Sequence, residues 1–345
     1  MIELGPQDDQ MAYGGPVAPM VADAAWFDRF YFDLHGPDGR PAVVVGGAIY
    51  PSGNLQDAYV VAVVGGEQRN LRLSGELSES PRPGSLGPLS WQCIEPLKEW
   101  RLQLAFNPSG VELDLTWSAR APAWAVHPIS IASSPETPGV TDFNHFFQAG
   151  YWSGTLTIDG QISHVDGWSG QRDRSRGWRR ARDRLGMHLW IAAQMPAYSI
   201  GCNFNLDRQN HLSHFDGAVL GENGSARAIR GLRHNMEVDN LNLLQRGRVL
   251  IDMVDGESFE LAFEGVAPGL YMAGGGYGGW HGVKRGPLCI EHERWPLDGS
   301  FNPLTLPLGL VQTPARFTRG GETGHGLVEL ALSRSATYGY QSDLD

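Results

Sequence analysis

One segment of the chain gathers carboxylates and guanidinium groups more densely than any other. From Asp166 to Arg179 it reads Asp-Gly-Trp-Ser-Gly-Gln-Arg-Asp-Arg-Ser-Arg-Gly-Trp-Arg. Guanidinium groups can hold a carboxylate ionised and fix its geometry through paired hydrogen bonds, as a pre-organised polar site requires. Asp166 and Asp173 are therefore candidate catalytic carboxyl groups, with Arg172 and Arg179 as positioning groups. A solvated, salt-bridged linker explains the same composition, and the residues alone leave both interpretations open.

Histidines provide a second source of chemistry. His188 opens the first strand expected after the arginine-rich segment, and its imidazole is a candidate proton partner for the acid. His211, His214, His281 and His292 could join it as zinc ligands, since a catalytic zinc needs about three protein ligands. However, His211 and His214 lie three residues apart in an expected strand or turn, where they point to opposite faces. No metal site is predicted, and a metal-dependent enzyme is kept only as a third hypothesis.

Aromatic residues are abundant, with 11 tryptophans and 10 tyrosines. Their ring faces could line an apolar cavity and attract positive charge, although ordinary core packing explains any single one of them. Their positions along the chain select the following ligand-binding candidates: Trp91, Trp124, Trp152, Tyr271, Tyr277 and Trp280.

The absence of two common motifs argues against a serine hydrolase of the nucleophile-elbow type and against a P-loop phosphate-transfer enzyme. There is no GxSxG nucleophile elbow and no P-loop. Residues 274–279 match the dinucleotide pattern GxGxxG by spelling, but Trp280, His281 and Gly282 follow where a helix should begin. This stretch predicts a glycine-rich loop or bulge at the mouth of a barrel.

Composition and periodicity predict an all-β fold of two antiparallel barrels in tandem. The chain has 45 glycines, 22 prolines and only 19% charged residues, which is typical of many short strands joined by tight turns. Apolar residues alternate from Trp100 to Phe106 and again from Val111 to Trp117. Asp159 and Gly160 suit the type I′ turn of another hairpin.

The length of 345 residues favours two domains. We expect one barrel in residues 1–165, a second in residues 187–345, and an arginine-rich junction in residues 166–186. The stretch from Gln171 to Arg184 contains seven arginines and almost no apolar residue. We therefore expect this junction to be a connector or a polar plug, and not a core strand.

Charge and targeting signals limit the partners. The net charge is −11, so nucleic acid is not expected as a partner. No run approaches the roughly 20 apolar residues that span a bilayer, and no signal peptide is recognisable. These features predict a cytoplasmic protein. Transient membrane contact and the oligomeric state stay open. Cys93, Cys202 and Cys289 are odd in number and far apart, which favours buried apolar roles over disulfides.

Several stretches resemble the lipocalin-like superfamily of carotenoid 1,2-hydratase (hydroxyneurosporene synthase) and AttH-type proteins. That family has a hairpin ending GxLxIxG and then a segment reading roughly DGxGxRDHSWGxR, which residues 154–160 and 166–179 follow with the same spacing. Weaker similarities cover residues 26–32, 95–101 and 324–329. Arg174 and Arg176 stand where the family pattern has His and Trp.

The resemblance implies an apolar substrate held in or between two barrels without a cofactor. Adding water to an alkene, or cyclising it, needs a proton donor in a water-poor pocket. The first hypothesis is therefore a cofactor-independent hydratase, cyclase or isomerase acting on a terpenoid-like substrate. The alternative is a non-catalytic lipid or hydrophobic-ligand binding protein, for which a barrel interior is equally suited.

Overall fold

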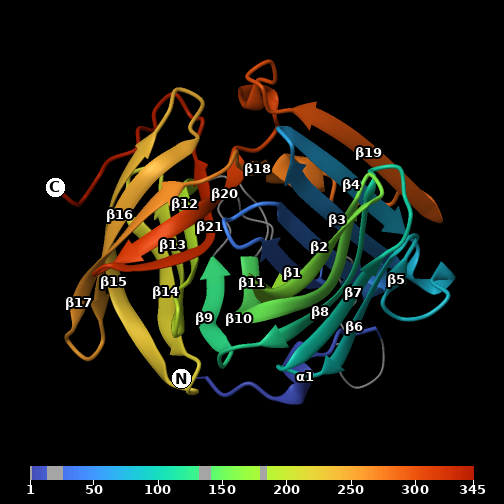
Figure 1. Cartoon of the computed structure of the whole chain (residues 1–345), viewed down its shortest axis with the longest axis horizontal. Helices are drawn as coiled ribbons and strands as arrows, with labels where there is room; N and C mark the ends of the chain where they lie inside the picture. Colours follow the sequence, from blue (N-terminus) through green and yellow to red (C-terminus); the bar gives the residue numbers. More distant parts are fainter. Residues whose placement is uncertain (1, 14–25, 132–140, 179–184) are drawn as a thin grey trace.

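The computed structural model describes residues 2–13, 26–131, 141–178 and 185–345. These residues form two antiparallel β-sheets that lie side by side, together with short helical turns (Figure 1). The predicted all-β fold of two lipocalin-like barrels is confirmed. None of the described helices is long and apolar enough to cross a membrane.

The first sheet has 12 strands within the described residues, and it curls into a nearly closed barrel. Its strands are β1 (Phe27–His35), β2 (Ala42–Tyr50), β3 (Leu55–Val64), β4 (Glu67–Gly75), β5 (Ser85–Leu86), β6 (Leu89–Glu95), β7 (Glu99–Leu104), β8 (Val111–Ala119), β9 (Trp124–Ile131), β10 (Thr141–Ile158), β11 (Gln161–Trp178) and β19 (Leu288–Pro296). Their order is β19-β4-β3-β2-β1-β11-β10-β8-β7-β6-β5, and β9 pairs with β10.

The second sheet has 9 strands within the same part of the chain, and pairing of β17 with β20 closes eight of them into a barrel. Its strands are β12 (Leu185–Gln194), β13 (Tyr198–Asp207), β14 (Leu212–Gly221), β15 (Ala226–Val238), β16 (Leu244–Met253), β17 (Ser258–Gly265), β18 (Leu270–Tyr271), β20 (Leu310–Arg319) and β21 (Glu322–Leu332). The helical turns are α1 (Pro6–Asp9), η2 (Pro51–Gly53), η3 (Leu77–Glu79), η4 (Met272–Gly275) and η5 (Pro303–Thr305).

The two halves of the chain are not fully separate in space. Strand β19 comes from the second half of the sequence but pairs with β4 at the edge of the first sheet (Figure 1). The division into domains at residues 1–165 and 187–345 stays a prediction.

The arginine-rich segment differs from its expectation. Residues 161–178 form β11, which pairs with β1 on one side and β10 on the other. The expectation that its arginines exclude it from a sheet is wrong, because buried carboxylates compensate the guanidinium groups: Arg172 pairs with Asp9, and Arg174 with Asp28. A charged strand is tolerated inside a fold when each charge meets a partner.

Local turn chemistry agrees with the sequence. Asp159 and Gly160 connect β10 to β11 with φ values of 49° and 80°, as a type I′ turn requires. The hairpin of β7 and β8 also forms, but Phe106 lies beyond the end of β7 and is exposed. The three cysteines form no disulfide, and Cys202 is buried, whereas Cys93 and Cys289 are only half-buried.

The glycine-rich stretch has a packing reason. A Cβ on Gly274 would lie 1.9 Å from Asn70 Oδ1 of β4, and one on Gly275 would lie 2.7 Å from the Tyr59 ring of β3. The 3₁₀ turn η4 can therefore press against the first sheet only without side chains at these positions. The predicted loop interpretation is confirmed, since no dinucleotide-type helix follows.

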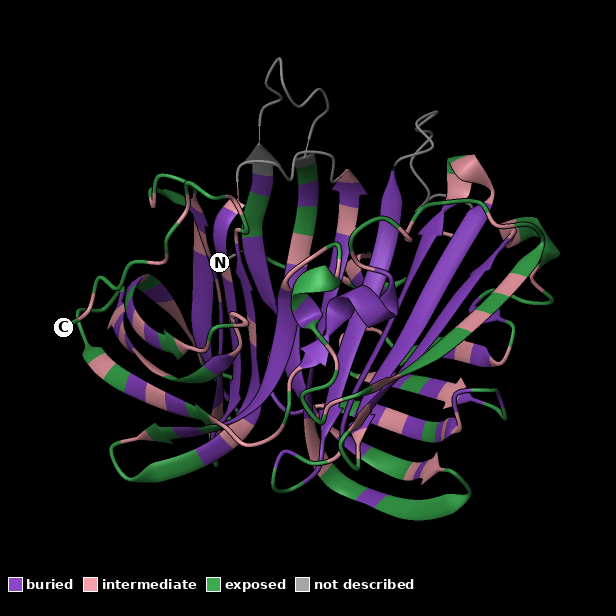
Figure 2. Cartoon of the chain, turned by 90° about the horizontal axis from the view of Figure 1, so that it is seen from above, coloured by how far each residue is buried: buried purple, intermediate pink, exposed green. Residues whose placement is uncertain are grey.

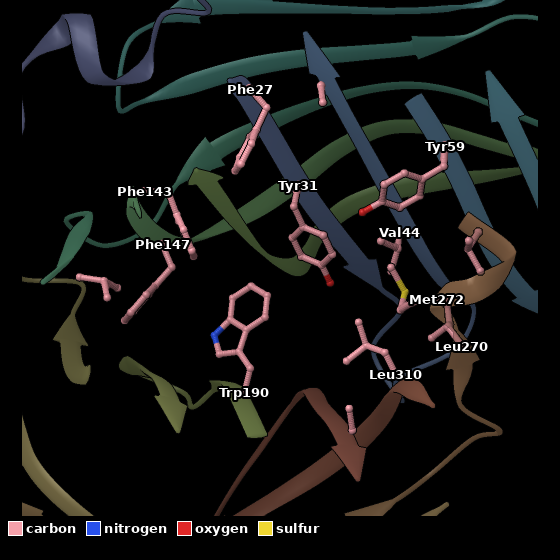
Figure 3. Close-up of a cluster of buried hydrophobic side chains, with 14 of the residues drawn as sticks. Phe27, Tyr31, Val44, Tyr59, Phe143, Phe147, Trp190, Leu270, Met272 and Leu310 are labelled. Atoms are coloured by element: carbon pink, nitrogen blue, oxygen red, sulfur yellow. The ribbon is translucent and has the colours of Figure 1, made fainter. Parts of the chain in front are cut away.

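Buried side chains form three clusters. Figure 2 shows that the strands in the middle of the molecule are buried along most of their length. One cluster fills the first barrel around Trp100 and Trp117, and another fills the second barrel around Ile191 and Phe317. The third lies between the barrels and takes residues from both sheets. We call it the interface cluster, and Figure 3 shows part of it.

Candidate active site at the barrel interface

The interface cluster exists because strands at the interface are buried on both faces. In β12, Met187, Leu189 and Ile191 point into the second barrel, while Trp190 between them points toward the first sheet. In β1, Phe30 and Phe32 point into the first barrel, and the alternate residues face the second. Figure 3 shows Tyr31 of β1 facing Trp190, and their ring centroids are 5.5 Å apart.

The register of five strands places one row of side chains across this face. Phe147 of β10 is opposite Asp173 of β11, which is opposite Tyr31 of β1. Tyr31 is opposite Gly46 of β2, and Gly46 is opposite Tyr59 of β3. Directly opposed residues share a face, so a carboxylate and two phenols lie in one line beneath the second barrel.

Gly46 determines how the row is packed. A Cβ at this position would lie 2.4 Å from the Tyr59 hydroxyl, so the Tyr59 ring occupies the space that a side chain would take. The Tyr59 hydroxyl is 3.1 Å from the hydroxyl of Tyr277, which comes from the segment after η4. Burial raises the pKa values of both phenols, so they remain protonated at neutral pH.

A hydrogen-bonded chain joins this row to the second barrel. The Tyr31 hydroxyl donates to Gln312 Oε1 at 2.9 Å, and Gln312 Nε2 donates to Glu329 Oε2 at 2.6 Å. Glu329 Oε1 is 2.7 Å from Nε2 of His188, whose Nδ1 is 2.6 Å from Asn205 Oδ1. Burial raises the pKa of Tyr31 well above its usual value, and the negative charge of Glu329 adds to this effect. The chain thus fixes a protonated phenol in one orientation.

Asp173 lies beside this phenol. It is 9% exposed, and its Oδ1 is 3.9 Å from Nδ1 of His145 on β10. The His145 ring also contacts Trp190, with a centroid distance of 6.4 Å. Asp173 is therefore a nearly buried carboxyl group with an imidazole and a phenol as neighbours.

Asp33 is a second carboxyl group on the same face of β1, two residues after Tyr31. It is 2% exposed, and burial, together with the charge of Asp173, raises its pKa to about 8 despite a hydrogen bond from the Gln171 amide to Oδ1. Its other oxygen, Oδ2, has no hydrogen-bond partner among the residues that the structure describes. With its pKa near 8, Asp33 is largely protonated at neutral pH.

A third carboxylate on this face has the opposite character. Asp57 of β3 lies 3.3 Å from Nδ1 of His281 and accepts a hydrogen bond from the Gly282 amide at 2.7 Å. Burial would raise the pKa of Asp57, but His281 and Arg29 outweigh it and lower the pKa. Asp57 is an ionised anchor for the segment that carries Tyr277.

The predicted positioning groups do not face this site. Arg172 lies on the opposite side of β11 from Asp173, since neighbouring residues in a strand alternate. Its guanidinium binds Asp9 inside the first barrel, with Nη1–Oδ1 at 2.6 Å and Nη2–Oδ2 at 2.9 Å, so the expectation that it positions Asp173 is wrong. Arg179 lies outside the described residues.

The predicted aromatic residues are distributed over several regions. Trp124 belongs to the interface cluster, and Tyr277 packs against it. Trp91 and Trp152 fill the first barrel. Tyr271 packs on Phe301. Trp280 donates to Glu291 at 3.0 Å near the edge strand β19.

Asp166 and the histidines are also dispersed. Asp166 is exposed on the rim of a groove at one end of the interface, away from the row that contains Asp173. His188 is in the chain described above, whereas His211 is exposed next to Asp207. Within the described part of the chain, no three His, Cys, Asp or Glu residues form a cluster suited to a metal ion.

Another surface pocket contains none of the site residues predicted from the sequence. It measures about 390 Å³ and lies over β15, β16, β17 and β20 of the second barrel. Its charged side chains already pair with one another, as Arg246 does with Glu237 and Arg316 with Glu264. It offers surface ion pairs and no reactive group.

Sequence reasoning missed Tyr31, Asp33, Gln312 and Glu329. A signal for the first two is present, because residues 27–35 place acidic and basic residues within an otherwise apolar strand. All nine of those residues are buried. Gln312 and Glu329 give no such signal, since their roles depend on contacts with a strand about 280 residues away.

Comparison with known sequences identifies a family for this chain. A family model described as Family of unknown function (DUF8625) matches residues 8–341. No curated protein sequence is significantly similar to this chain.

Three solved structures share the two-barrel architecture. An AttH-type protein from Nitrosomonas europaea is 13% identical with a TM-score of 0.56, covering 89% of this chain and 92% of its own. Kievitone hydratase from Nectria haematococca is 12% identical with a TM-score of 0.53, covering 89% of each chain. CghA, solved with Sch210972, is 12% identical with a TM-score of 0.55, covering 90% of this chain and 89% of its own. The resemblance to AttH-type proteins is thus confirmed for the fold.

Proposed function

The chain belongs to the Family of unknown function (DUF8625), and we propose that it is a cofactor-independent hydratase, cyclase or isomerase. It acts by acid–base chemistry on a small, apolar, terpenoid-like substrate bound between the barrels. The fold that it shares with kievitone hydratase supports this reaction class.

The observation that carries the proposal is the pair of carboxyl groups on one buried face. Asp33 on β1 is held neutral, while Asp173 on the adjoining strand β11 supplies negative charge that raises the pKa of Asp33. Two carboxyl groups whose environments separate their pKa values are the usual arrangement for an acid and a base. Asp33 protonates the alkene carbon from Oδ2, and Asp173, assisted by His145, takes a proton from the attacking water or from the substrate carbon.

The surroundings suit a cationic intermediate. Protonating an alkene leaves a carbocation, which aromatic ring faces stabilise by cation–π attraction. Tyr31, Tyr59, Phe147 and Trp190 supply such rings on both sides of the interface (Figure 3). Leu270, Met272 and Leu310 extend the apolar lining, which favours a hydrocarbon substrate.

The same face argues against a purely passive binding protein. Such a protein would have its few buried polar groups satisfied, because an unpaired polar group costs about 1–3 kcal/mol. Asp33 Oδ2 has no hydrogen-bond partner among the described residues. An unsatisfied acid on an apolar face is expected when a substrate completes the site.

The test combines ligand identification with isotope incorporation. Mass spectrometry of apolar molecules that copurify with the protein would select isoprenoid candidates. These candidates would then be incubated with the enzyme in D₂O, and products would be examined for carbon-bound deuterium and for gain of water. We expect Asp33→Asn and Asp173→Asn each to reduce turnover by at least about 100-fold, the lower range for losing a general acid or base.

Asp166→Asn is the matched control, because Asp166 is an exposed carboxylate away from the row. It should retain the wild-type rate. Full activity of Asp33→Asn with an unchanged melting temperature would refute the acid assignment. Deuterium-free products would refute protonation at carbon altogether.

A further inference from the structure

A groove of about 260 Å³ opens between the two barrels at the end of the interface where β1 ends. Residues of the first sheet line one side and residues of the second barrel line the other. The lining includes His35 of β1 and Gln194 of β12, which are 2% and 4% exposed. We propose that this groove is a second binding site, which takes a neutral small molecule through one of its hydroxyl groups.

His35 provides a hydrogen-bond acceptor. Its Nε2 lies 3.8 Å from Asp33 Oδ1, and this oxygen already accepts the Gln171 amide hydrogen. The arrangement favours the tautomer with hydrogen on Nε2, pointing to the carboxyl oxygen, and leaves a lone pair on Nδ1. Nδ1 has no hydrogen-bond partner in the part of the chain that the structure describes.

Gln194 provides a hydrogen-bond donor. Its Oε1 is identified because it accepts from Arg120 Nη1 at 3.1 Å, and a guanidinium can only donate. The other amide atom is therefore the nitrogen, and this Nε2 finds no acceptor among the described side chains and backbone. A hydroxyl group both donates and accepts, so it supplies the donor that His35 Nδ1 lacks and the acceptor that Gln194 Nε2 lacks.

The charges around the groove select a neutral ligand. Burial, with a contribution from the neighbouring His325, lowers the pKa of His35 to about 3, so its imidazole is uncharged. Arg120 donates to Glu222, Gln194 and the carbonyls of Met195 and Pro196, and the carboxylate of Glu222 balances its charge. Asp166 on the rim repels anions further.

The proposed reaction assigns no step to His35 or Gln194, although His35 Nε2 lies 3.8 Å from Asp33 Oδ1. A failure of that chemistry would therefore leave this inference intact, and binding is measured without any turnover.

The test uses phenol, anisole and benzoate as probes on the full-length protein. Anisole is phenol with its hydroxyl hydrogen replaced by a methyl group, so it can accept but not donate a hydrogen bond. Benzoate has a similar ring but carries a negative charge. Isothermal titration would measure affinity, and ¹⁵N spectra of the histidine side chains would report on His35 Nδ1. We expect saturable phenol binding with a shift of the Nδ1 resonance, anisole at least tenfold weaker, and no benzoate binding.

His35→Phe keeps the ring volume but removes the acceptor, and it should weaken phenol binding about tenfold. His164→Phe, at an exposed position of β11 outside the groove, is the matched control and should leave binding unchanged. The wild-type comparison of phenol with anisole decides the question even if His35→Phe fails to fold. Equal affinity for the two probes, stronger binding of benzoate, or no movement of the His35 resonance would overturn the proposal.

Discussion

Arg172 and Asp9 form a bidentate ion pair in the interior of the first barrel, where both side chains are fully buried. Trp100 donates to the same carboxylate at 3.1 Å, and the Trp117 ring lies 4.7 Å from the guanidinium carbon. Burial alone would raise the pKa of Asp9, but the charge and hydrogen bonds of Arg172 lower it. The pair ties the N-terminal turn α1 to the central strand β11.

Removing one member of this pair should be more damaging than removing both. Arg172→Met leaves a buried carboxylate without its cation, and we expect a loss of about 3–5 kcal/mol in the free energy of unfolding. Adding Asp9→Asn should recover a large part of that loss. Urea unfolding of the two single variants and the double variant measures this coupling, and simple additivity would contradict it.

Asp33 should make stability fall as pH rises. Its pKa is about 8 in the folded protein against a reference value of 3.8. Below pH 3.8 both folded and unfolded chains hold the proton, and the contribution of Asp33 is fully present. Between pH 3.8 and about 8 only the unfolded chain releases it, so the free energy of unfolding decreases by up to about 1.4 kcal/mol per pH unit.

Asp33→Asn should flatten this dependence, because an amide does not titrate. Melting temperatures between pH 5 and pH 8 measure the slope for both proteins. Asp166→Asn, at an exposed carboxylate, should keep the wild-type slope. Parallel curves for wild type and Asp33→Asn would mean that Asp33 ionises normally.

Gly46 should not tolerate a side chain. Gly46→Ala places its Cβ against the Tyr59 ring, and we expect a loss of about 1–3 kcal/mol in the free energy of unfolding as the ring is displaced. Gly231→Ala is the matched control, since a Cβ there meets no atom within 4 Å. It should be neutral or slightly stabilising in the same urea titration. Equal effects at both positions would argue against the tight packing of Tyr59.

Replacing two buried tryptophans by phenylalanine should destabilise the protein to different extents. The Trp124 indole donates to Asp216 Oδ1 at 2.8 Å, whereas the Trp190 indole nitrogen has no hydrogen-bond partner within the described structure. Trp124→Phe should therefore cost at least about 1 kcal/mol more than Trp190→Phe, because it deprives a buried carboxylate of a donor. Chemical denaturation of both variants gives the difference, and a larger cost for Trp190→Phe would contradict it.

Local sequence was informative wherever the relevant contacts are local. Alternating apolar residues located the strands of the β7–β8 hairpin, and the Asp159-Gly160 pair located the turn between β10 and β11. The same reasoning failed for β11, because an isolated view of its arginines cannot include their partners. Asp9 and Asp28 lie 163 and 146 residues away from the arginines that they neutralise.

The candidate site shows the same division. The sequence determined that this is an all-β chain, that His188 lies in the first strand after the arginine-rich segment, and that Tyr277 belongs to a glycine-rich turn. Only the tertiary structure decided that Tyr31, Asp33 and Asp173 share one face, that Arg172 turns away from it, and that Gln312 and Glu329 reach it from the other barrel. The reason is physical: side-chain alternation is set within a strand, whereas strand register and the packing of two barrels are set by contacts between residues far apart in the chain.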